Sequence, residues 1–281
     1  MMKSFWNRYT EDDHLTWGRL LVRQREILAH RACDELLGAE LALSPHAIPR
    51  FEDLNQVLGA RTGWTITPVT GLLTDRDFFA HLASRVFPVT WWIRKPEQLD
   101  YLEEPDLFHD LFGHVPLLIQ PSFAHLMQAF GRAGVAAADE GPGPLECLTR
   151  LYWFTVEFGL IATRGGLRLY GAGIASSKEE SVYCIESPIP HRLVFSPERA
   201  MRTGYRLDAV QQTYFVIDDF AQLKILLEDQ LLERCIAASR LPTIPAGVVL
   251  PSDRRLEQVG TVDPRPMFDL SSGVACPAPG W

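Results

Sequence analysis

A single carboxylate lies inside an apolar segment of this chain and limits the folds that the chain can adopt. Glu157 lies in LYWFTVEFGLIAT, residues 151–163, where its neighbours are almost all aromatic or aliphatic. Burying a carboxylate without a partner costs several kcal/mol, so the fold must bring a positive charge to it. The sequence leaves two kinds of partner open: an arginine such as Arg164 or Arg168, or a metal ion held by other side chains.

A pair of histidines lies upstream in HDLFGHVPLL, residues 109–118. Neutral imidazole is the commonest protein ligand for first-row transition metals. On an ideal α-helix the spacing of His109 and His114 turns their side chains by about 140° from one another. Both can bind one ion only if the helix ends between them or a bulge re-aims one of them, and Gly113 and Pro116 allow either. The alternative is that one histidine packs in the core and the other is exposed.

Two histidines and one carboxylate with open coordination positions form the facial triad of non-haem Fe(II) oxygenases. His109, His114 and Glu157 are therefore candidate ligands of one metal ion. The histidine spacing differs from the H-E-x-x-H of zinc hydrolases, although a zinc hydrolase with the same three ligands remains a competing interpretation. A further alternative is a helical binding module with structural histidines, which leaves Glu157 without a strong partner.

Composition argues against several other classes of protein. The formal charge of −8 disfavours nucleic acid or an anionic membrane surface as the main partner. No apolar stretch is long enough to span a membrane, and the first residues lack the apolar core of a signal peptide. The five cysteines include no C-x-x-C pair, which is typical of a reduced protein whose thiols pack. We expect a cytoplasmic monomer.

Hydrophobic periodicity predicts an α+β fold that is mainly helical, with a few short strands. Helices are expected over residues 14–40, 51–60, 74–87, 103–113, 121–140, 141–163 and 215–235, and short strands over 63–73, 87–95 and 165–177. Residues 1–240 are predicted to form one domain. Residues 241–281 are predicted to be a proline-rich C-terminal tail, extended or partly disordered.

Several longer stretches, in order, resemble the pterin-dependent aromatic amino acid hydroxylases. They are GLLTDRDFFAHLASRVF, WIRKPEQLDYLEEPD, YLEEPDLFHDLFGHVPLL, LYWFTVEFGL, LYGAGIASS and QQTYFVIDDF, which lie between about residue 60 and about residue 230. The chain shows neither a regulatory domain before this region nor a long coiled-coil tail after it, so it is most similar to the bacterial phenylalanine 4-hydroxylases.

The resemblance implies a single catalytic domain around a non-haem iron site. It implies Fe(II) and a tetrahydropterin, either tetrahydrobiopterin or a related reduced pterin, as cofactors. The implied reaction is para-hydroxylation of L-phenylalanine to L-tyrosine with O2. Tryptophan 5-hydroxylation and phenylalanine 3-hydroxylation remain alternatives, because a few pocket residues decide between them.

Carried over residue by residue, the resemblance also implies three groups of site residues. His109, His114 and Glu157 would hold Fe(II). Phe78 would stack on the pterin ring, and further pterin contacts would come from Gly71, Leu72, Leu73, Asp75 and Asp110. Arg94 would pair with the substrate carboxylate, Ser176 would hold the backbone groups of the amino acid, and the pocket for its ring would be walled by Pro105, Trp153, Phe158 and Gly173.

Three positions depart from the pattern of the family. Lys178 and Glu179 stand in SSKEE where members commonly have an aromatic residue and a glycine. Leu102 replaces a threonine of the animal members. Leu207 stands where tyrosine-hydroxylating members have an acidic residue, and an apolar side chain there favours phenylalanine as the substrate.

Overall fold

Helices dominate the computed structural model, which describes residues 6–256 apart from residues 39, 40, 42, 72, 101, 103, 228 and 229. The α-helices are α2 (Glu11–Leu28), α3 (Asp34–Leu37), α4 (Phe51–Thr62), α5 (Asp75–Ala83), α6 (Pro121–Glu140), α7 (Pro142–Tyr152), α8 (Ala172–Ala175), α9 (Lys178–Glu186), α10 (Pro197–Met201) and α11 (Leu231–Ser239). The strands are β1 (Thr65–Val69), β2 (Val86–Thr90), β3 (Leu160–Thr163), β4 (Gly166–Leu169), β5 (His191–Val194) and β6 (Thr213–Ile217). Short 3₁₀ turns cover Pro96–Gln98, Val115–Ile119 and Phe220–Leu227.

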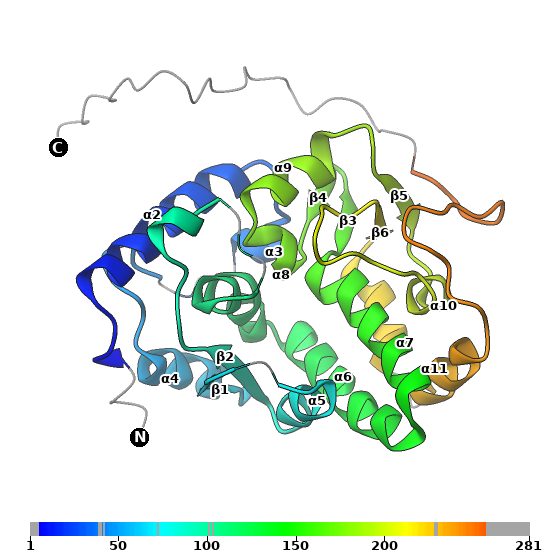
Figure 1. Ribbon diagram of the computed structural model, residues 1–281, viewed down its shortest axis with the longest axis horizontal. Helices are drawn as coiled ribbons and strands as arrows, with labels where there is room; N and C mark the ends of the chain where they lie inside the picture. Colours follow the sequence, from blue (N-terminus) through cyan, green and yellow to red (C-terminus); the bar gives the residue numbers. More distant parts are fainter. Residues whose placement is uncertain are drawn as a thin grey trace.

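The strands form two separate sheets (Figure 1). β1 and β2 pair in parallel beside α4 and α5, as the patterns over 63–73 and 87–95 predict. The second sheet has the order β4-β3-β6-β5, in which β3 and β4 form an antiparallel hairpin and the other neighbours are parallel. The helices predicted over 141–163 and 215–235 are wrong at these strands, because periodicity cannot distinguish a short buried strand from buried helix.

Three predicted helices also end elsewhere than expected, and the one predicted over 74–87 stops at Ala83, because Val86 and Phe87 belong to β2. The helix predicted over 14–40 stops at Leu28, because the chain turns there to pair with β4. The N–H of Cys33 donates to the Leu169 carbonyl at 2.9 Å, and the N–H of Leu169 donates to the Arg31 carbonyl at 2.8 Å. Helix α4 passes Gly59 and ends before Gly63, whose φ of 74° is the left-handed conformation that terminates helices.

Helices and cysteine side chains pack closely in the core. Helix α6 packs along α5, and Gly134 makes this possible, because a Cβ at that position would lie 2.1 Å from the ring of Phe79. Cys33, Cys147, Cys184 and Cys235 are free and buried, which confirms that these thiols pack, while Cys276 lies outside the described residues. Within the described ranges, no helix is both long and apolar enough for a membrane crossing.

The first part of the predicted tail lies against the domain. The N–H of Ile244 donates to the Arg202 carbonyl at 2.7 Å, and the N–H of Val194 in β5 donates to the Arg254 carbonyl at 2.8 Å. Asp253 pairs with Arg199 of α10. Residues 241–256 thus extend the packed body beyond residue 240, and residues 257–281 lie outside the described part of the chain.

Candidate metal centre

The two histidines lie on a π-helix, His109–His114, at the end of a short helical turn. In a π-helix each N–H bonds to the carbonyl five residues earlier, so side chains five residues apart lie on one side. The N–H of Val115 makes such a bond to the Asp110 carbonyl. The helical bulge is one of the two geometries that allow His109 and His114 to meet, and the structure adopts it.

Glu157 reaches the same point from a second π-helix, Trp153–Glu157, which continues α7. The Nε2 atoms of His109 and His114 are 3.1 Å apart. His114 Nε2 lies 3.0 Å from Glu157 Oε1, and His109 Nε2 lies 3.7 Å from Glu157 Oε2. The sequence left open whether the partner of Glu157 is an arginine or a metal ion held by other side chains. The structure places the two candidate metal ligands, His109 and His114, beside Glu157.

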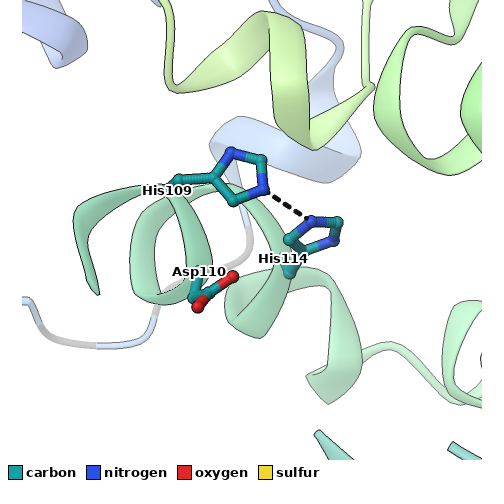
Figure 2. A group of neighbouring side chains, drawn as sticks. All are labelled: His109, Asp110 and His114. Atoms are coloured by element: carbon teal, nitrogen blue, oxygen red, sulfur yellow. Dashed lines mark hydrogen bonds between the residues drawn. The ribbon is translucent and has the colours of Figure 1, made fainter. Parts of the chain in front are cut away.

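Asp110 is a further carboxylate beside the histidines (Figure 2). One ligand atom each from Asp110, His109 and His114 lie within 4.8 Å of one another. However, Asp110 Oδ2 accepts a hydrogen bond of 2.6 Å from the N–H of Thr90. Glu157 lies nearer the imidazole nitrogens and is the stronger candidate for the third ligand, with Asp110 as a neighbour that ties the π-helix to β2.

The protonation states suit a cation. Burial lowers the pKa of His109 to about 4, so its imidazole is neutral at pH 7. Burial alone would raise the pKa of Glu157, but His114 outweighs it and holds the pKa below its usual value. Burial alone would lower the pKa of His114, but Glu157 outweighs it and raises the pKa above its usual value, so a bound cation would take the place of the His114 proton. With that proton released, two neutral imidazoles and a carboxylate form a donor set that first-row divalent metals accept. The three residues therefore fit a metal ion such as Fe(II).

Ser176 fixes which nitrogen of His109 is free. Its hydroxyl donates to the Ala172 carbonyl at 3.0 Å, so it accepts from Nδ1–H of His109, 2.9 Å away. The proton is thereby held on Nδ1, and the lone pair of Nε2 points to His114 and Glu157. The hydroxyl of Ser176 thus orients His109, and the contact of Ser176 with the backbone groups of the substrate stays a prediction.

Glycine lets α8 approach the histidine-bearing helix. A Cβ at Gly113 would lie 2.8 Å from the Ala172 carbonyl oxygen. On α8 itself, a Cβ at Gly173 would lie 3.0 Å from the ring of Phe158 and 3.1 Å from Glu157 Oε2. Gly173, expected in the wall of the substrate pocket, thus lies beside both a predicted wall residue and a predicted ligand.

Arg94 is buried rather than on the surface. Its Nε and Nη2 donate to the two oxygens of Asp106 at 2.8 and 2.9 Å. Asp106 is fully buried and also accepts from the N–H of His109 at 3.1 Å. Asp106 was not predicted from the sequence, because a carboxylate in the acidic segment EEPD gives no local signal. Pro105, the preceding residue, is exposed.

An aromatic group borders the centre. The indole of Trp153 stacks on Tyr205 with ring centroids 4.2 Å apart and lies 4.5 Å from Phe158. Phe78 is half-buried and meets Phe79 and Tyr152 edge to face. Tyr205, which comes from a loop distant in the sequence, is a residue that sequence reasoning missed.

The loop before α5 lines a hollow that is open to solvent. This hollow of about 380 Å³ is lined by Pro68, Val69, Thr70, Gly71 and Leu73. Leu72, a predicted pterin contact, lies outside the described residues. Asp75 begins α5 and accepts from the Thr149 hydroxyl at 3.1 Å, which joins α5 to α7. Thr74 caps α5, because its hydroxyl accepts from the N–H of Asp77.

The departures in SSKEE lie outside this centre. Lys178 and Glu179 begin α9 and line an open hollow of about 640 Å³ together with Asp100, Val182, Tyr183, Glu186 and Ser187. Lys178 Nζ lies 3.2 Å from Asp100 Oδ1, so the lysine forms a surface ion pair. None of the residues that line this hollow is a predicted ligand, cofactor or substrate contact.

A helical fold that brings two histidines and a carboxylate together is the arrangement expected of a mononuclear metalloprotein of the facial-triad type. Residues 6–234 match the family model of the biopterin-dependent aromatic amino acid hydroxylases, and the chain belongs to this family. It is similar to the phenylalanine-4-hydroxylase of Ralstonia nicotianae, with 53% identity over 88% of this chain and 79% of the relative. The phenylalanine-4-hydroxylase of Chromobacterium violaceum is 57% identical over 77% of this chain and 73% of the relative.

A solved structure agrees with the fold. The Chromobacterium violaceum phenylalanine hydroxylase with bound iron(III) and oxidised 7,8-dihydrobiopterin superposes with a TM-score of 0.84 at 50% identity, covering 89% of this chain and 90% of that one. The resemblance stated from the sequence and the predicted fold class are thereby confirmed.

Proposed function

We propose that this protein para-hydroxylates L-phenylalanine to L-tyrosine with O2, a tetrahydropterin and non-haem Fe(II). The observation that carries the proposal is the convergence of His109, His114 and Glu157 within one buried site of a family member. The relatives named phenylalanine-4-hydroxylase, and the solved relative with iron and a biopterin, support the substrate and the cofactors. When bound, iron and the reduced pterin supply the activation of dioxygen and the electrons that it needs.

The residues of the chain bind and orient the partners in this proposal. His109, His114 and Glu157 hold the metal, and Ser176 keeps the lone pair of His109 Nε2 directed at it. Phe78 offers an aromatic face for the pterin, and the open loop with Gly71 and Leu73 receives the rest of the ring system. Leu72, Asp75 and Asp110 stay predicted pterin contacts.

Arg94 is the proposed partner of the substrate carboxylate. Asp106 holds its guanidinium from one edge, which sets its orientation before the substrate arrives. Trp153, Phe158, Gly173 and Pro105 are the proposed wall around the substrate ring. The neighbouring rings of Trp153 and Phe158 would limit the access of water to the reacting partners, and no further side chain is assigned as an acid or base.

The location and assembly of the protein are finer points of the proposal. The net charge and the lack of a membrane-crossing helix in the described ranges are consistent with a cytoplasmic enzyme. We propose that the protein has no nucleic acid or membrane partner and is a monomer. Light scattering of the full chain tests the monomeric state.

The test is product analysis of the iron-loaded full chain with tetrahydropterin and air, offered phenylalanine, tyrosine and tryptophan in turn. The expected product is para-tyrosine from phenylalanine, with none formed when the pterin is omitted. Meta-tyrosine or 5-hydroxytryptophan as the main product would overturn the substrate assignment. Glu157→Gln is the matched variant, expected to lose both iron and product while the circular dichroism spectrum stays unchanged. Activity of the zinc-loaded protein as a hydrolase would contradict the proposal.

A further inference from the structure

The indole of Trp153 is held at its nitrogen as well as at its face. Its Nε1–H donates to Oε1 of Gln211 at 3.2 Å. The ring planes of Trp153 and Tyr205 are only 13° apart at a centroid distance of 4.2 Å. A side chain restrained at a ring edge and at a ring face cannot rotate freely about χ1 or χ2. The indole of Trp153 is therefore held in one orientation.

Gln211 can present only its oxygen to the indole. The amide nitrogen Nε2 donates to the Arg206 carbonyl at 2.8 Å, and the Ala209 carbonyl lies 3.4 Å away. Flipping the amide would turn its oxygen to these carbonyls and its N–H to the N–H of Trp153, which removes every bond at once. Gln211 is 4% exposed, so water cannot replace these bonds.

The backbone of Gln211 is also held by a hydrogen bond. Its N–H donates at 2.9 Å to Oε1 of Glu180, a buried carboxylate of α9. The same oxygen accepts from the hydroxyl of Tyr214 in β6. Glu180 therefore connects the sheet to the loop of residues 204–211, and Gln211 connects that loop to the indole.

We propose that Gln211 is a positioning residue that fixes the rotation of the Trp153 indole and thereby sets the size of the aromatic ring that the substrate pocket accepts. This inference rests on the proposed function, in which Trp153 walls the pocket. A fixed indole leaves room for the single ring of phenylalanine and excludes a bicyclic ring. An indole released from Gln211 can swing, so selection by ring size weakens while the metal ligands stay in place.

The test compares kcat/KM for phenylalanine with that for tryptophan in the iron-loaded full chain and in Gln211→Leu. The leucine matches the size of glutamine and removes the acceptor. We expect the preference for phenylalanine to fall by about 3- to 10-fold, the ratio that corresponds to one net hydrogen bond. The iron content should stay unchanged.

A double-mutant cycle separates positioning from general destabilisation. Trp153→Phe removes the N–H that Gln211 binds, so adding Gln211→Leu in that background should change the preference by less than about twofold. Gln128→Leu is the matched control, since this glutamine also bridges a side chain and a carbonyl, Arg85 and Ala83, away from the aromatic wall. It should leave the preference unchanged.

If Gln211→Leu does not fold, Gln211→Asn serves instead, because it keeps an amide but withdraws the oxygen from the indole. An unchanged preference in the folded Gln211 variant, or an equal change with and without the indole, would overturn the inference alone. A wild-type chain that makes no product from any aromatic amino acid would overturn the proposed function and this inference with it.

Discussion

At the scale of single residues, two neighbouring serines have different roles and allow a matched test. Ser176→Ala removes the acceptor that holds the proton on His109 Nδ1, so we expect iron affinity to fall by about 10- to 100-fold. Ser177→Ala removes instead the N-cap of α9, where its hydroxyl accepts from the N–H of Glu180, and should cost about 1 kcal/mol of unfolding free energy. Chelator competition measures the first effect and thermal denaturation the second. Equal iron affinities in the two variants would contradict the role assigned to Ser176.

Some residues of the site could be predicted from the sequence, and others could not. His109, His114 and Glu157 were predictable because their chemistry is unusual for their apolar surroundings. Asp106, Tyr205 and Gln211 were not singled out, because a carboxylate, a tyrosine or a glutamine in a polar segment gives no local signal. Their importance comes from contacts with Arg94 and Trp153 that only the folded chain creates.

At the scale of elements, the π-helix His109–His114 depends on the close approach of α8. A Cβ at Gly113 would lie 2.8 Å from the Ala172 backbone oxygen, so Gly113→Ala must push the two helices apart. We expect a loss of about 1–3 kcal/mol in unfolding free energy and weaker iron binding, since His109 and Ser176 separate. Gly59→Ala is the control, because nothing lies within 4 Å of its added Cβ and it sits inside α4. It should stabilise the protein by up to about 1 kcal/mol. Denaturant unfolding and iron titration of both variants check this, and unaltered iron binding in Gly113→Ala would refute the dependence.

The elements were easier to predict where one physical signal dominated. Helix α6 follows from a long amphipathic period, and α5 follows from the cap at Thr74. The break after Leu28 could not be predicted, because the pairing of Cys33 and Arg31 with Leu169 joins segments more than 130 residues apart. Tertiary hydrogen bonds there outweigh a helical pattern that continues to residue 40.

At the scale of the whole molecule, residues 241–256 are expected to be part of the folding unit. They bond to α10 through the Arg202 carbonyl and to the edge strand β5 through Arg254. A chain that ends at residue 240 should therefore unfold at a clearly lower temperature than one that ends at residue 256, with exposed backbone groups on β5. Calorimetry of the two truncations, with the full chain as reference, measures this. Equal transition temperatures would show that the predicted boundary at residue 240 is the true limit of the stable domain.

The attachment of this segment should also depend on pH through Asp253. Burial alone would raise its pKa, but the hydrogen bonds from Arg199 and from the N–H of Leu250 outweigh burial and hold the pKa below its usual value. A carboxyl group whose pKa is lowered by folding stabilises the native state above its unfolded pKa of about 3.9, and this stabilisation is lost as the pH falls through the lower native pKa. Asp253→Asn should thus cost about 2 kcal/mol of unfolding free energy at pH 7 and progressively less below about pH 4. Asp208→Asn, which breaks a fully exposed pair with Arg206, should change stability little at any pH. Urea unfolding from pH 7 to pH 3 distinguishes the two, and a pH-independent cost for Asp253→Asn would mean that its packing, and not its charge, holds the segment in place.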